Sequence, residues 1–153
     1  MTNAATHTLI AIPCGAAKLD SAAPARELYA SSNFALTLRA AEAEAAATER
    51  DLGTPARVVI LSALHGLIEL DEVVAPYDVK MADAEHIAPA AVARQLDALA
   101  PAVLVSMLPG AYRAVLAEAS DACAAEPEFL DVYEYSPGIG YQRGTSTALI
   151  RNA

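Results

Sequence analysis

The chain has 153 residues with 19 acidic and 10 basic side chains, a formal net charge of −9, and is long enough for one domain with its own core. Because it has no Lys/Arg cluster, we expect no non-specific binding to duplex nucleic acid. The first residues, MTNAATH, lack a basic start, and the apolar run after them is too short for a signal peptide or a membrane span, so we expect a cytoplasmic protein with no membrane association.

The first half of the chain predicts a strand, a helix and a second strand. THTLIAIP, at 6–13, is a continuous apolar run of the kind found in wholly buried strands. The Ala/Glu/Arg segment that starts at Ser32, its expected N-cap, predicts a helix that ends near Gly53. The β-branched run at 57–63 predicts the next buried strand.

The second half repeats this alternation after an irregular segment. We interpret residues 68–83 as a long functional loop, because they combine proline and charge without any period. Further elements follow: a helix from Pro89 to Pro101, a buried strand at 102–107, a helix after Pro109, an edge or closing strand at 128–135, and a glycine-rich tail leading into a terminal strand, TALI.

Alternating strands and helices predict a single α/β domain over residues 1–153, a three-layer sandwich with a mostly parallel central sheet of about four to five strands. Ligands of such sheets bind beyond the carboxyl ends of the strands. Cys14, Ser62, His65 and Ser106 fall at or just past those ends, so we expect them to share one rim.

The segment PCGAAK, at 13–18, follows the first strand and lacks the glycine spacing of both phosphate-binding fingerprints. Cys14 is a candidate nucleophile, or a buried and inert thiol. Lys18, one of only two lysines, is a candidate for anion binding or for covalent addition to an electrophilic carbon, the alternative being a solvated side chain. Cys14 and Cys123 are far apart and have no CxxC partner, so we expect no zinc site, and we expect no disulfide in a reducing cytosol. We also expect no cofactor.

Three further groups of polar residues are candidates. Tyr29 and Ser31 can line a ligand pocket or cap a helix. In SALHG, His65 is a candidate catalytic residue, the alternative being a structural histidine, and Gly66 permits a tight turn or a close approach to a ligand. No G-x-S-x-G elbow is present. Asp78 is a candidate general acid or base, or the cap of a turn.

The C-terminal segment PGIGYQRG, at 137–144, is a weaker candidate. Its backbone amides and Arg143 can cradle an anion, or the glycines can form a closing turn.

Taken in order, PCG-AA-K, ARELY, VVILSALHGLI and VAPYDVKM resemble an uncharacterised family of domains of unknown function spread among phages and actinobacteria. More remotely, PCGAAK followed by Tyr and Ser is similar to a stretch of archaeosine synthase, and there is a weak likeness to YaaA-type proteins. The resemblance to archaeosine synthase implies that Lys18 matches a lysine that modifies a deazaguanine base, with Cys14 its neighbour and Tyr29 and Ser31 lining the base pocket. This chain departs from that pattern, because Tyr29 lies further along the chain from Lys18 than the tyrosine lies from the lysine in archaeosine synthase.

The sequence therefore leads us to expect a small enzyme acting on a nucleobase, nucleoside or nucleotide, by N-glycosidic cleavage or transfer or by lysine-mediated base modification. The expected catalytic residues are Lys18, Asp78, His65 and Cys14, and the expected substrate-binding residues are Gly15, Tyr29, Ser31, Ser62, Gly66 and Tyr77. The alternative is a non-catalytic nucleotide-binding module or a phage or defence accessory protein.

Overall fold

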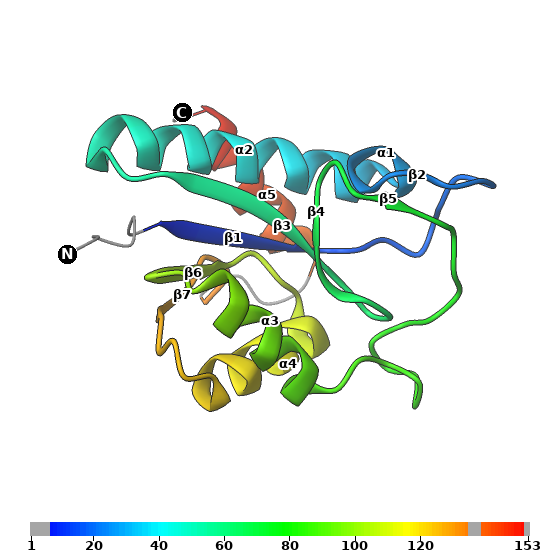
Figure 1. Ribbon diagram of the computed structural model, residues 1–153. Coiled ribbons are helices and arrows are strands. Elements are labelled where there is room, and N and C mark those ends of the chain that lie inside the picture. Colours follow the sequence, from blue (N-terminus) through cyan, green and yellow to red (C-terminus); the bar gives the residue numbers. More distant parts are fainter. Residues whose placement is uncertain (1–6, 135–138, 152–153) are drawn as a thin grey trace.

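A five-stranded sheet forms the centre of the protein, and its strand order is β4-β3-β1-β6-β7 (Figure 1). The computed structural model describes residues 7–134 and 139–151. The strands are β1 Thr8–Pro13, β3 Ala56–Ser62, β4 Gly66–Glu69, β6 Val103–Ser106 and β7 Glu128–Asp131. All neighbours pair in parallel except β4, which runs antiparallel to β3, so the prediction of a mostly parallel sheet is confirmed.

Helices cover both faces of this sheet, which confirms the three-layer arrangement (Figure 1). Helices α2, Ser32–Leu52, and α5, Ile139–Arg151, lie on one face. Helices α3, Pro89–Leu99, and α4, Gly110–Ala122, lie on the other. In the part of the chain described, no helix is long and apolar enough to cross a membrane.

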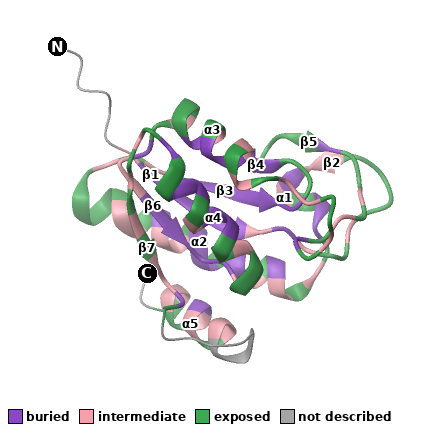
Figure 2. Ribbon diagram, turned by 90° about the horizontal axis from the view of Figure 1, so that it is seen from below, coloured by how far each residue is buried: buried purple, intermediate pink, exposed green. Residues whose placement is uncertain are grey.

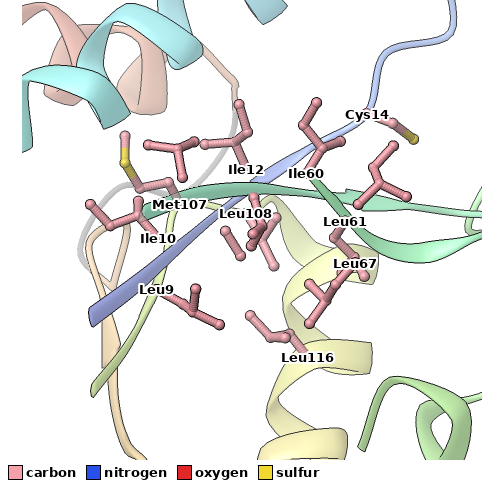
Figure 3. Packing of buried hydrophobic residues seen from close by; sticks show 14 of the residues in the cluster. Leu9, Ile10, Ile12, Cys14, Ile60, Leu61, Leu67, Met107, Leu108 and Leu116 are labelled. Carbon is pink, nitrogen blue, oxygen red and sulfur yellow. The ribbon is translucent and has the colours of Figure 1, made fainter. Parts of the chain in front are cut away.

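Strand β1 sends side chains into both layers, which is why its sequence is apolar without alternation. Ile10 and Ile12 point toward the layer of α2, and Leu9 points toward Leu116 of α4 (Figure 3). All four of these side chains are fully buried. Figure 2 shows the same strand in the buried interior, between exposed helix faces. The core therefore fixes the carboxyl end of β1, where Cys14 follows.

The predicted helix boundaries are correct to within one residue for α2. Ser31, not Ser32, is the N-cap, and its Oγ accepts from the Phe34 N–H at 3.1 Å. Gly53 ends the helix in the left-handed conformation, with φ of 68°. Pro89 opens α3 in the first turn, where its missing N–H costs nothing.

The segment 68–83 is more ordered than the loop expected from the sequence. Its first residues belong to β4, and β5, Val73–Val74, pairs antiparallel with β2, Ala23–Pro24, in a second small sheet. The short helix α1, Ala25–Leu28, follows β2, and its first two N–H groups donate to the carbonyls of Glu72 and Leu70 at 2.8 Å each. These bonds hold the segment against α1 and beside the carboxyl ends of β1 and β3.

The predicted terminal strand TALI is wrong, because these residues lie in α5. Packing of the segment against α2 overrides the β-branched composition that suggested a strand. Residues 137–138 of the glycine-rich stretch lie outside the described residues, and 139–144 begin the helix. Arg143 Nη1 donates to Asn33 Oδ1 at 3.1 Å, so this guanidinium already has an amide partner. Of the predicted strand at 128–135, only Glu128–Asp131 is a strand, and residue 135 lies outside the described part.

Candidate functional site

In the loop after β1, the segment around Lys18 pairs with the segment around Tyr29 further along the chain. Lys18 and Tyr29 form an isolated antiparallel bridge, flanked by the bonds Leu19 N–H to Leu28 carbonyl at 2.9 Å and Ala30 N–H to Ala17 carbonyl at 2.8 Å. This pairing places Lys18 and Tyr29 side by side although they come from opposite ends of the loop. A rigid loop of this kind suits a site that must hold a cation in a fixed position.

The ring of Tyr77 is the meeting point of the predicted site residues. Lys18 Nζ lies 4.4 Å from the centre of this ring and 5.8 Å from that of Tyr29. The His65 ring packs edge to face against Tyr77, with ring centres 5.3 Å apart and an interplanar angle of 84°. Lys18 and His65, which follow different strands, therefore contact the same aromatic ring, an arrangement in which a cation is attracted by the electron-rich face.

The hydroxyl group of Tyr77 belongs to a hydrogen-bonded chain of hydroxyl groups. The Tyr77 hydroxyl oxygen is 2.6 Å from the Tyr29 hydroxyl oxygen and 2.6 Å from Ser62 Oγ. Ser62 Oγ also accepts from the N–H groups of Leu64, at 3.2 Å, and His65, at 3.1 Å. Because these two bonds use both lone pairs of Ser62 Oγ, its O–H has to be the donor toward Tyr77.

Cys14 lies at the end of β1, where its chain leaves the sheet (Figure 3), and contacts a residue that the sequence did not identify as part of a site. Its Sγ lies 3.2 Å from the hydroxyl of Tyr112, in the first turn of α4. Cys14 is 8% exposed, so it is neither a solvent-facing thiol nor fully enclosed. Tyr112 lies in the helix that the sequence predicts after Pro109, and that pattern carries no signal of its polar contact with Cys14.

Burial keeps the phenols of this cluster protonated. Desolvation, with a smaller contribution from the nearby Cys14 thiol, raises the pKa of Tyr29 to about 12, against the opposing effect of its bond to Tyr77. The pKa of Tyr77 and that of Tyr112 are also raised, mainly by burial and then by Cys14. At neutral pH these groups are hydrogen-bond donors and not bases.

The turn that carries His65 is held by Gln95 of α3, a second residue that the sequence did not identify. Its Nε2 donates to the His65 carbonyl at 3.0 Å, and its Oε1 accepts from the Leu67 N–H at 2.8 Å. Gly66, between them, has φ of 74°, and a Cβ there would lie 2.3 Å from Gln95 Oε1. The tight turn and this close packing account for glycine at position 66.

The chain was compared with known proteins. A model of a family of unknown function, DUF6884, matches residues 9–126. The chain belongs to this family. No curated protein and no solved structure matches it. The match to DUF6884 spans Cys14, Lys18, Tyr29, Tyr77 and Tyr112, so the whole cluster lies in the part of the chain that defines the family.

The remaining candidates of this DUF6884 chain lie around the cluster or apart from it. The Asp78 side chain is exposed and makes no hydrogen bond or ion pair within the described residues, so nothing joins it to Lys18. Ser31 uses its hydroxyl as the cap of α2, and Gly15 lies beside Ser31 and Tyr29. Ser106 is fully buried, and its Oγ finds no hydrogen-bond partner among residues 7–134 and 139–151.

The arrangement brings together one primary amine, one imidazole, one thiol and several neutral hydroxyl groups on aromatic walls. Among the residues described, no group of three His, Cys, Asp or Glu side chains gathers as a metal site would require. The cluster is built mainly from donors, which suits a ligand that presents acceptor oxygens and a flat ring.

Proposed function

We propose that this protein is a small enzyme that acts on a nucleobase, nucleoside or nucleotide at the cluster formed by Lys18, Tyr29, His65 and Tyr77. The observation that carries the proposal is the convergence of Lys18 and His65 on the ring of Tyr77. Aromatic walls favour stacking with a planar base, and the donor groups suit its acceptor oxygens.

Of the two reactions that the sequence leaves open, the geometry favours the one centred on Lys18. The Lys18 amine lies against the aromatic cluster, whereas the carboxylate of Asp78, needed for N-glycosidic chemistry, is exposed. After losing a proton to solvent, the Lys18 amine forms a bond to an electrophilic ring carbon conjugated to a carbonyl group, and a pair of π electrons moves onto the exocyclic oxygen of that carbonyl. Neutral hydroxyl donors, positioned in advance, stabilise such a charge as it develops.

Thermal-shift screening of nucleobases, nucleosides and nucleotides, followed by mass spectrometry of each stabilising ligand, tests this function. We expect Lys18→Ala to abolish turnover and to leave the melting temperature close to that of the wild type. Among the residues that the structure describes, the Lys18 side chain makes a single hydrogen bond, to the Ala16 carbonyl at 3.3 Å. Lys80→Ala is the matched control, because Lys80 is the other lysine and its side chain is exposed.

The results separate the two classes of function. Wild-type turnover in Lys18→Ala overturns the lysine-centred reaction. A ligand that binds and is recovered unchanged indicates the alternative, a non-catalytic binding module. If no compound of these classes binds, the nucleotide-related function is wrong.

A further inference from the structure

The segment that carries Tyr77 is anchored at both ends and not in its middle. Upstream, β5 pairs with β2 and ends at Val74. Downstream, Lys80 and Asp83 bond to each other, and the Ile87 N–H donates to the Ala63 carbonyl at 2.7 Å. Within the described residues, no backbone-to-backbone hydrogen bond joins 75–79 to the rest of the protein. This stretch can therefore move without breaking either sheet.

The side chain of Tyr77 supplies the polar attachment that the backbone lacks. Its hydroxyl bonds to Tyr29 and Ser62, and its ring lies against Lys18 and His65. Tyr29 is only 3% exposed and Ser62 is fully buried, so a ligand reaches their hydroxyls only where the Tyr77 phenol now is.

Resting on the proposed function, we propose that the Tyr77 phenol is an internal surrogate for the ligand, and that the ligand is a planar ring with an exocyclic oxygen that displaces it. A phenol is itself a flat ring that carries one oxygen. Here the ring faces a cation, and the oxygen meets two buried hydroxyl groups. An oxo-nucleobase offers the same two features in the same plane.

Ser62 determines which exocyclic group of a base the site prefers. Its lone pairs are taken by the N–H groups of Leu64 and His65, so it offers only a hydrogen to whatever replaces Tyr77. An exocyclic oxygen in the place of the Tyr77 hydroxyl oxygen accepts from Ser62, whereas an exocyclic amino group in the same place leaves this donor unpaired. The site should therefore prefer oxo-bases to amino-bases.

The first arm of the test measures dissociation constants for two matched pairs, uridine against cytidine and inosine against adenosine. In the wild type we expect the oxo member of each pair to bind about tenfold more tightly, the value of one satisfied hydrogen bond. Tyr77→Ala should bind the oxo members about tenfold more tightly still, because no phenol has to be displaced. Tyr133→Phe, which alters a buried phenol bonded to Ser146, is the control and should change neither value.

Several outcomes overturn the inference while leaving the proposed function standing. Equal affinities within each pair, or a preference for the amino member, would mean that Ser62 does not select an exocyclic oxygen. Loss of all binding in Tyr77→Ala makes Tyr77 a wall of the site and not a surrogate. Absence of any nucleoside binding in both proteins overturns the ligand class named here, and the proposed function falls with it when nucleobases and nucleotides also fail to bind.

The second arm tests displacement without any ligand, through the thiol of Cys14, which is close enough to Tyr77 to raise the pKa of its phenol. In a Cys123→Ser background Cys14 is the single cysteine, and its rate of alkylation reports how often the cluster opens. Tyr77→Phe loses the hydrogen bonds to Tyr29 and Ser62, so we expect alkylation to be at least about tenfold faster than in the parent. Tyr133→Phe in the same background should leave the rate unchanged. Equal rates for Tyr77→Phe and its parent, or an equal increase for Tyr133→Phe, would show that the hydrogen bonds of the Tyr77 phenol do not keep the cluster closed.

Discussion

The hydroxyl oxygens of Tyr29 and Tyr77 lie 2.6 Å apart, although the two residues are 48 positions apart in the chain. The bond joins the loop after β1 to the segment after β5, and Ser62 extends it to the end of β3. Three segments that the sequence separates thus share one chain of hydroxyl groups.

Tyr29→Phe and Tyr77→Phe should each reduce the free energy of unfolding by about 1–3 kcal/mol, because each leaves a buried hydroxyl with fewer partners. The double variant should lose less than the sum, since either change alone breaks the shared bond. Urea unfolding of the four proteins of the cycle measures the coupling. Tyr29→Phe combined with Tyr133→Phe is the comparison, and that pair should be additive within about 0.5 kcal/mol.

Gly66→Ala should destabilise the protein by more than about 3 kcal/mol, because a strained φ of 74° is combined with a Cβ 2.3 Å from Gln95 Oε1 and 2.7 Å from Ile87 Cδ1. Gly53→Ala is a matched control, since its φ is 68° and no atom lies within 4 Å of its Cβ. It should cost about 1–2 kcal/mol, the backbone contribution alone. Equal losses for the two variants, measured by thermal unfolding, would mean that Gln95 and Ile87 give way.

Ser106→Ala should leave stability unchanged or raise it, because it removes a fully buried hydroxyl with no hydrogen-bond partner in the described part of the chain. Ser62→Ala should instead cost about 2–4 kcal/mol, since that equally buried Oγ bonds to Tyr77 and to the N–H groups of Leu64 and His65. Chemical denaturation of both variants gives the comparison. A loss in Ser106→Ala as large as in Ser62→Ala would point to an ordered water bound at Ser106.

Stability should fall as the pH rises above about 10, the ordinary pKa of tyrosine. In the unfolded chain Tyr29 then loses its proton, whereas in the folded protein, with a pKa of about 12, it keeps it. The stability that Tyr29 contributes is complete below pH 10 and is lost as the pH rises toward 12, by roughly 3 kcal/mol. Tyr29→Phe should make the fall less steep in unfolding curves recorded across this range. An identical pH dependence in both proteins would show that Tyr29 is not protected by burial.

The sequence by itself determined the α/β class and the rim of the sheet. Continuous apolar runs identify buried parallel strands, because a strand covered on both faces has no polar side. Capping residues and prolines place the ends of α2 and α3 for equally local reasons. The polar residues after β1 and β3 were predicted to converge, and Lys18 and His65 do meet on Tyr77.

Only the tertiary structure decided which side chains touch. Tyr112 and Gln95 looked like ordinary helix residues in the sequence, and their contacts with Cys14 and the His65 turn depend on how α4 and α3 dock on the sheet. The TALI segment became helical through packing against α2. Local patterns record the preferences of neighbouring residues along the chain, whereas these contacts join residues far apart in sequence, whose distance is set by the packing of whole elements.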